Sequence, residues 1–199
     1  MPDKIWVVPP QNTPGNGFIN ISFSRTPLVR AGIYLYHAPD KIKKAISLAV
    51  NRSLENFKTV SIRETAEKYF TKQKDIRSSI TLKRSYGGQM HGLIISRGHR
   101  QPLTKFAFTP KSTPTKPGSF RGAVKQAGGL KPIPLAFLIN RHGNKRAFIR
   151  DDKSLRMLMS PSIPQMMKNK NTVNEAEKSA REVFNNRLEH ELKRVGILL

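Results

Sequence analysis

The chain has 199 residues, with 36 Lys and Arg against 13 Asp and Glu, and a formal net charge of +23. An apolar fraction of 37% that includes ten Phe can build a modest core, which excludes a wholly disordered polymer. The absence of cysteine excludes disulfides, thiolate zinc sites and a Cys nucleophile. Such an excess of cations opposes compaction unless counter-charge is nearby, so it indicates an acidic partner, either nucleic acid or protein.

Residues 1–39 predict extended segments separated by turns, and together they hold too little core to fold alone. Ile5–Val8 is a short strand candidate, Phe18–Phe23 alternates in part as a half-buried strand does, and Ile33–Tyr36 is a further apolar run. We therefore predict an extended N-terminal arm or hairpin over 1–39, followed by one domain over 40–199.

Membrane insertion is not expected from this sequence. The first residues lack the apolar run of a signal peptide. The longest apolar stretch elsewhere, Pro132–Ile139, is far shorter than the ~20 residues that span a bilayer. We expect a soluble protein.

Apolar residues recur at helical spacing from Asp40 to Phe70, which predicts a long helix with Asp40 complementing the helix dipole. The stretch Thr59–Ser61, which includes the β-branched residues Thr59 and Val60, either kinks this helix or weakens it. A second, shorter helix is expected around Lys74–Ile80.

The chain from Thr81 to Asp152 predicts β-structure with turns at its Gly-rich clusters. The Pro-, Lys- and Thr-rich stretch 110–118 predicts an exposed loop or mobile linker. The strand candidates are Thr81–Arg84, Gly92–Ser96, Thr104–Phe108, Arg121–Val124, Leu135–Asn140 and Arg146–Arg150.

A C-terminal helix is predicted by an apolar stripe of period 3.6 from Val173 to Val195. Thr172 and Glu175 have the spacing of an N-terminal capping box, and Gly196 is a suitable stop. Pro161 and Pro164 interrupt any helix before it. The expected fold class is α+β, with a small, mostly antiparallel sheet packed by a long helix in the N-terminal half and a long C-terminal helix.

The charge is unevenly distributed along the chain. Between Ile76 and Arg150 there are 15 Lys and Arg and no Asp or Glu, whereas most carboxylates lie in the two long helices. One interpretation is a solvated surface that keeps strand edges from pairing; the other is a surface that faces phosphate or acidic protein. The candidate partner- or DNA-contacting residues are Lys83, Arg84, Arg97, Arg100, Arg121, Lys125, Arg141, Lys145 and Arg146.

Catalysis is poorly supported, because the acid-free region offers no carboxylate for an acid–base pair. The five histidines show no paired metal-ligand spacing; His37 near Asp40 and His190 beside Glu189 are interpreted as surface residues. The pair Asp151 and Asp152 is a polar turn more readily than a metal site. We expect no catalytic residue, no cofactor and no metal, and therefore no enzyme.

Three parts of the chain together resemble a known family. A helix with Ala49-x-Asn51-Arg52, a segment Arg63-Glu64-Thr65-Ala66, and a short basic helix leading into Leu82-Lys83-Arg84 resemble the minor tail protein Z family of tailed bacteriophages. A basic β region with a Gly-rich centre and a long amphipathic C-terminal helix fit the same pattern, which covers roughly residues 40 to 196. Residues 1–39 depart from it.

The resemblance implies a structural virion protein that completes the head-proximal end of the tail, with a role in tail assembly and head–tail joining. It implies a ring, with a homo-hexamer as the expected form, whose partners are the tail terminator, the tape-measure end and the head-completion ring. The expected location is the virion tail or neck, and the host cytoplasm during assembly. Non-specific contact with packaged DNA stays open.

Two other classes of function remain as alternatives. A general nucleic-acid-binding protein of ribosomal or nucleoid type would also account for the composition. A nuclease or processing enzyme is disfavoured by the lack of an acidic cluster.

Overall fold

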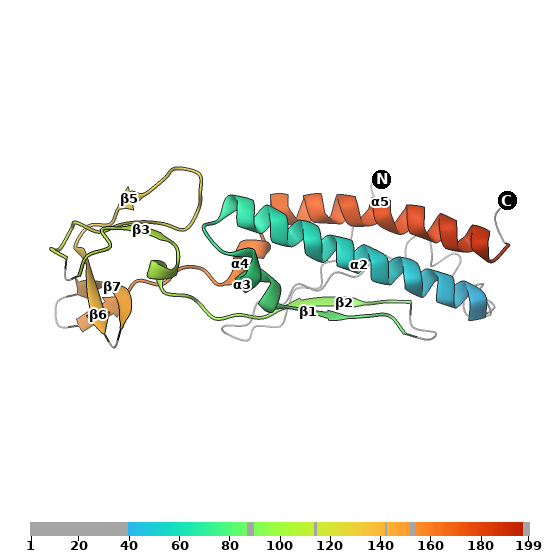
Figure 1. The fold of residues 1–199 in the computed structure, drawn as a ribbon, viewed down its shortest axis with the longest axis horizontal. Helices are drawn as coiled ribbons and strands as arrows, with labels where there is room; N and C mark the ends of the chain where they lie inside the picture. Colours follow the sequence, from blue (N-terminus) through green and yellow to red (C-terminus); the bar gives the residue numbers. More distant parts are fainter. Residues whose placement is uncertain (1–39, 87–89, 114, 142, 152–153, 197–199) are drawn as a thin grey trace.

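A computed structural model describes residues 40–86, 90–113, 115–141, 143–151 and 154–196. The predicted arm over 1–39 lies outside the described residues. Figure 1 shows an elongated molecule with two long helices side by side at one end and two small β-sheets at the other. We refer to these parts as the helical half and the β end.

The helical half is built on α2 (Asp40–Lys68) and α5 (Lys170–Arg194), which run antiparallel. Ile46, Val50, Leu54 and Phe57 form the buried stripe of α2, as the spacing predicts. The α5 residues facing this stripe include Ala176 and Ala180, which have no exposed surface. Because alanine is small, α5 can approach α2 closely.

Polar contacts also join the two helices to each other. Ser179 Oγ donates to Asn56 Oδ1 at 2.9 Å, and Lys68 Nζ donates to Thr172 Oγ1 at 3.1 Å. The same ammonium lies 3.1 Å from Glu64 Oε2, so the end of α2 is joined to the start of α5.

Helix α2 continues without interruption through Thr59–Ser61, where a kink was one expectation. Thr59 Oγ1 donates to the carbonyl of Glu55 at 2.9 Å, while Val60 and Ser61 are buried, so tertiary packing outweighs their modest helix propensity. The helix ends at Lys68 rather than Phe70, because the Phe70 N–H donates to the Val124 carbonyl at 2.8 Å.

The predicted capping box at Thr172 and Glu175 is wrong. Helix α5 begins at Lys170, and Asn169 is its N-cap, with Oδ1 accepting from the Asn171 N–H at 3.1 Å. Thr172 is instead buried in the first turn against Lys68. The predicted stop is confirmed, since α5 ends at Arg194 and Gly196 has a φ of 79°.

Two short helices flank these elements. The α3 helix (Gln73–Ser78) matches the short helix expected after α2. The α4 helix (Ile163–Met167) was not expected, because Pro164 was interpreted as a breaker. Pro164 lies in the first turn, where an N–H has no intrahelical partner, and proline is tolerated there.

An antiparallel hairpin of β1 (Ile80–Lys83) and β2 (Leu93–Ser96) lies along α2 (Figure 1). Ile80 and Ile94 point into the same core as the helices. Two predicted strands are thereby confirmed, and they are the ones that pack on the helical half.

The β end contains two further antiparallel sheets. One has the order β3 (Ala107–Thr109), β4 (Arg121–Ala123) and β5 (Lys131–Pro132); the other has β6 (Ala136–Arg141), β7 (Asn144–Asp151) and β8 (Ser154–Met157). A 3₁₀ turn, η1 (Leu103–Lys105), occupies the start of the predicted strand Thr104–Phe108. Phe108 and Phe120 stack in the core between the sheets, with ring centroids 6.0 Å apart.

The α+β class and the antiparallel pairing are confirmed, but the strands form three small sheets rather than one. Because the strands are short and are interrupted by Gly and Pro, they cannot form one continuous sheet. Each set of neighbouring strands therefore pairs within its own small sheet. Within the stretch 110–118, Lys111, Ser112 and the residues 116–118 are exposed as expected, yet the described part of the stretch is hydrogen-bonded to β6. Thr115 Oγ1 accepts from the Leu138 N–H at 2.8 Å, and the Gly118 N–H donates to the Ala136 carbonyl at 3.0 Å.

A small separate core joins the two ends of the molecule. Tyr69, Phe106 and Met166 are buried together, with Val124 packed against them. The backbone N–H of Gln126 donates to the Lys68 carbonyl at 2.9 Å, and its side chain donates to the Ala66 carbonyl at 2.8 Å. Within the described ranges, no helix combines the length and apolar character needed to cross a bilayer.

Candidate interaction surface

The nine predicted contact residues do not form one patch. Lys83 and Arg84 lie on the β1–β2 hairpin beside α2, whereas Arg121 and Lys125 lie on and after β4 at the far end. Arg97 and Arg100 occupy the connection between β2 and η1; Arg141, Lys145 and Arg146 lie on the β6–β7 hairpin. The side chain of Arg141 is outside the described part of the structure, and the other eight are exposed.

Arg84 already has a carboxylate partner. Its guanidinium Nη2 lies 2.6 Å from Glu55 Oε1 of α2. Both side chains are partly exposed, so the pair adds little stability. The pair therefore orients Arg84 toward α2 and leaves half of its side chain exposed.

Asn51 anchors the same hairpin. Its Nδ2 donates to the Ser85 carbonyl at 3.0 Å, and its Oδ1 accepts from the Ser85 N–H at 2.7 Å. Such a two-way bond gives the end of β1 a fixed position on α2. Gly92 allows the other strand to come close, since a Cβ there would lie 2.3 Å from Leu54 Cδ1. Asn51 and Leu82-Lys83-Arg84, which suggested the phage family, are thus neighbours in space.

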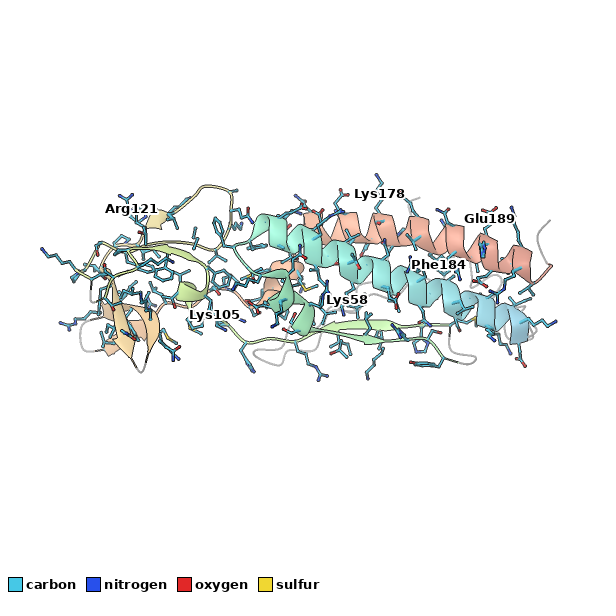
Figure 2. All side chains as sticks on the ribbon, in the orientation of Figure 1. Lys58, Lys105, Arg121, Lys178, Phe184 and Glu189 are labelled. Atoms are coloured by element: carbon cyan, nitrogen blue, oxygen red, sulfur yellow. The ribbon has the colours of Figure 1, made fainter. Side chains whose placement is uncertain are left out.

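The cations of the β end have no such partners within the described residues. Between Gln101 and Met159 the sequence has twelve Lys and Arg against two Asp. Every ion pair found among the described residues lies in the helical half, including its hairpin. Figure 2 shows long side chains radiating from the β end, with Arg121 and Lys105 marking opposite sides.

Some of these cations pack on neutral groups instead. Lys111 Nζ lies 3.4 Å from the centroid of the Phe108 ring, a cation–π contact. Lys145 Nζ donates to the Lys111 carbonyl, and Arg146 Nη1 donates to Met157 Sδ at 3.5 Å. These contacts orient the side chains without neutralising them, so their charge is still available to a partner.

The helical half offers the contrast. Glu191 is buried, and Arg187 and Arg194 lie 2.6 Å and 3.5 Å from its two carboxylate oxygens. Lys193 pairs with Glu189 at 3.1 Å, and Arg63 lies 3.8 Å from Glu67. Partial burial raises the pKa of Glu177 above its usual range, and the nearby Arg181 partly offsets this.

The sheet of β6, β7 and β8 presents an outward face that sequence reasoning missed. On its inner face, Ala136, Leu138 and Ala147 are fully buried. The alternate residues point outward, where Phe137 and Phe148 lie directly opposite each other and the guanidinium groups of Arg146 and Arg150 are exposed. The run Ala136–Ile139, apolar on both faces, was the signal in the sequence that the outer face also carries apolar side chains.

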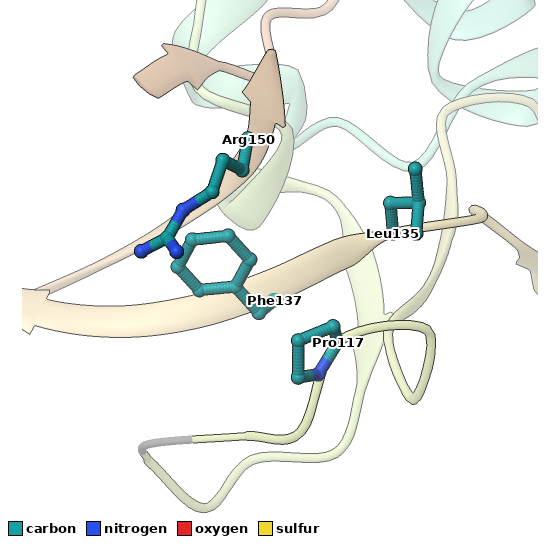
Figure 3. A pocket seen from close by; sticks show the side chains of 4 residues that line it. All are labelled: Pro117, Leu135, Phe137 and Arg150. Carbon is teal, nitrogen blue, oxygen red and sulfur yellow. The ribbon is translucent and has the colours of Figure 1, made fainter. Parts of the chain in front are cut away.

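A shallow pocket of about 480 Å³ opens on this face. It is lined by Pro117, Leu135, Phe137 and Arg150, and Figure 3 shows the Arg150 guanidinium directed toward the Phe137 ring. The mixture of an aromatic ring, aliphatic groups and an arginine is typical of protein interface cores.

The residues considered for catalysis or metal binding do not come together. No group of three or more His, Cys, Asp or Glu that could hold a metal is present among the described side chains. His190 is exposed and lies 3.9 Å from Glu191 Oε1, as a surface histidine would. His37, His142 and Asp152 fall outside the described residues.

Comparison of the chain with models of known protein families, with curated proteins and with solved structures finds no match. Any assignment of function therefore rests on the residues and their arrangement.

Proposed function

We propose that the protein is a structural virion component of a tailed bacteriophage or phage-like particle, which completes the head-proximal end of the tail. The observation that carries the proposal is the separation of charge. In the helical half (residues 40–100 and 160–196), ten carboxylates offset part of the charge of 21 Lys and Arg and hold several of them in ion pairs, whereas the β end has two Asp for twelve Lys and Arg. This suits a subunit held in an assembly.

The contacts of the family-like residues support the same proposal. Ala49 is fully buried, Asn51 holds Ser85, and Arg84 meets Glu55. Residues that are distant in sequence therefore act together to fix one hairpin on one helix. The residues that carry the resemblance thus lie together in the fold rather than at scattered positions.

The proposed assembly is a homo-hexameric ring between the tail terminator, the tape-measure end and the head-completion ring. An elongated subunit with chemically different ends favours head-to-tail contacts, and such contacts close into rings. A ring multiplies the subunit's charge, so the neighbouring rings or the DNA must supply the counter-charge. The proposal assigns no catalytic residue, cofactor or metal.

Deletion and complementation test the proposal directly. The gene is deleted from the phage or prophage genome, and lysates made with and without the protein supplied in trans are imaged by electron microscopy. We expect full heads and tails that remain unjoined, or tails lacking their upper end, and restored particles on complementation. Normal infectious particles in the deletion would refute a structural role.

A general nucleic-acid-binding protein is the second candidate, because the same uncompensated cations would neutralise phosphates. Duplex DNA binding measured over a salt series separates the two functions. A protein of this type would lose affinity with a log–log slope of about −0.9 for each phosphate neutralised. If the deletion phage joins heads to tails normally and this steep slope is found, the second candidate replaces the first.

A further inference from the structure

The two edges of the β6–β7–β8 sheet differ in whether another segment of the chain is hydrogen-bonded to them. The β6 edge is covered by Thr115–Gly118 through hydrogen bonds to Leu138 and Ala136. On the opposite edge, β8 pairs with β7 alone among the described strands. Beyond Met157, the Leu103 N–H donates to the Leu158 carbonyl at 3.0 Å, and Pro102 forms a bridge with Met159. Among the described residues, one edge is therefore closed by the chain itself, and the other is open along Leu155–Met157.

The register shows which backbone groups of β8 face outward. The Leu158 N–H donates to the Ala147 carbonyl at 2.8 Å, so this pair is hydrogen-bonded. Because such pairs alternate along an antiparallel ladder, Arg156 bonds to Ile149 across the ladder. Leu155 and Met157 then direct their N–H and C=O groups away from β7. These four groups are spaced to pair with one more strand.

The side chains along this edge alternate in character. Leu155 and Met157 lie on the outer face with Phe148, and 51% of the Leu155 surface is exposed. Arg156, between them, points to the other face and is exposed. An open edge with a large exposed apolar residue is a known liability, which proteins avoid unless the edge is used.

Backbone strain marks the far corner of the same outer face. Leu135 has a φ of 59°, in the left-handed region that bulky residues rarely adopt, and 64% of its surface is exposed. Glycine would occupy this position without strain. Strain retained at an exposed leucine points to a contact that needs the side chain.

We propose that the β8 edge accepts an extended, acidic segment of a partner protein, which adds as a fourth strand to this sheet. The proposal deepens the proposed function, and rests on it for the identity of the partner as another virion protein. The segment alternates apolar residues, beside Leu155 and Met157, with carboxylates beside Arg156. Arg150, opposite Leu155, adds electrostatic attraction to the acidic segment at the outer face.

Charge complementarity selects this occupant over two others. The β end carries twelve cations against two carboxylates, so an acidic segment is attracted and a basic one repelled. The chain's own residues 1–39 contain three Lys and Arg and one Asp, which does not fit. Nucleic acid fits the charge but cannot use the edge N–H and C=O groups as a strand does.

Peptide binding to the full-length protein, followed by fluorescence anisotropy, tests the proposal. The probe is a short labelled peptide that alternates Val and Glu. The control has the same residues with the Glu grouped together, which destroys the alternation but keeps the charge. We expect the alternating peptide to bind at least about tenfold more tightly, because only it satisfies both faces of the edge.

Two variants locate the site. Leu155→Pro removes an outward N–H without removing a ladder hydrogen bond, and proline is tolerated at such edge positions. It should weaken binding by about tenfold or more, whereas Leu155→Val should not. Should Leu155→Pro fail to fold, Arg156→Glu takes its place: it should lose the Glu peptide and gain affinity for the same peptide with Lys in place of Glu.

Three results would overturn the proposal. The first is equal binding of the alternating and grouped peptides. The second is tighter binding of a peptide made from the chain's own residues 16–25. The third is displacement of the probe by a single-stranded oligothymidylate that no longer binds to the Leu155→Pro variant. None of these bears on the deletion experiment, so head–tail joining could still depend on the protein.

Discussion

The helical half and the β end solve the same problem of excess charge in different ways. In the helical half, carboxylates are interleaved with cations, as in Lys68 with Glu64 and Arg84 with Glu55, and a large core binds the elements together. In the β end, the cations surround a smaller core built on Phe108 and Phe120. The comparison teaches that carboxylates offset part of the excess charge within the helical half, whereas the sequence of the β end supplies almost no counter-charge of its own.

Reversing charge at the β end should have the largest effect. The triple variant Arg121→Glu, Lys125→Glu and Arg146→Glu should reduce complementation of the deletion phage by at least about a hundredfold, because like charges facing each other across an interface cost several kcal/mol. All three side chains are exposed, so the thermal midpoint should change little.

The matched control reverses three exposed lysines of the helical half: Lys41, Lys44 and Lys178. Plaque counts for the two triple variants, each checked for folding by circular dichroism, give the comparison. If the control reduces complementation as much as the test variant, the contact surface is not confined to the β end.

The next prediction concerns the separate contributions of two hydrophobic cores to stability, the one that contains Phe57 and the one that contains Phe120. Phe57→Ala and Phe120→Ala each remove a fully buried ring and should each cost about 3–5 kcal/mol. We expect Phe57→Ala to speed amide hydrogen exchange in α2 and α5, and Phe120→Ala to speed it in β3, β4 and β6, because each core packs its own elements.

Hydrogen-exchange mass spectrometry on both variants measures this. If either substitution speeds exchange equally throughout, the junction of Tyr69, Phe106 and Met166 couples the two ends into one cooperative unit. The two cores would then not stabilise separate parts of the molecule.

The long helices could be predicted from sequence because their cause is local and repeated. Ile46, Val50, Leu54 and Phe57 recur at helical spacing over a length that no strand reaches. Gly196 ends α5 for a reason contained in one residue, its tolerance of positive φ. The segregation of charge was likewise visible in the sequence alone.

What sequence reasoning missed depends on partners distant in the chain. Thr172 is a residue type that often caps helices, but its hydroxyl instead accepts a hydrogen bond from Lys68 of another helix. The division into three sheets, and the cover that Thr115 gives the β6 edge, are settled by which strands meet in space. The outer sheet face was missed because Phe137 and Phe148 belong to two separate strand candidates, and the face that they share shows only in the register.

A smaller effect is expected at the anchor of the β1–β2 hairpin. Asn51→Ala removes both hydrogen bonds to Ser85 and leaves partly buried backbone groups unpaired, which should cost about 1–3 kcal/mol. Chemical denaturation measures the loss, and faster exchange should be confined to β1 and β2. Asn185→Ala, on the exposed side of α5, is the control. A loss below that of the control would show that Asn51 is not the anchor.

The smallest effect concerns Glu177 in α5, where the experiment tests whether burial or attraction to Arg181 dominates at this carboxyl. Burial raises the pKa of this carboxyl, so its contribution to stability is present below the pKa of the unfolded chain and is lost as the pH rises through the folded value. Glu177→Gln has no charge to bury. Its thermal midpoint should match that of the parent protein in acid and exceed it slightly at neutral pH. Thermal melts from about pH 4 to pH 7, with Glu182→Gln as an exposed control on the same helix, decide the point. A variant that is less stable at neutral pH would mean that attraction to Arg181 outweighs burial, and that the helical half pairs even this carboxylate.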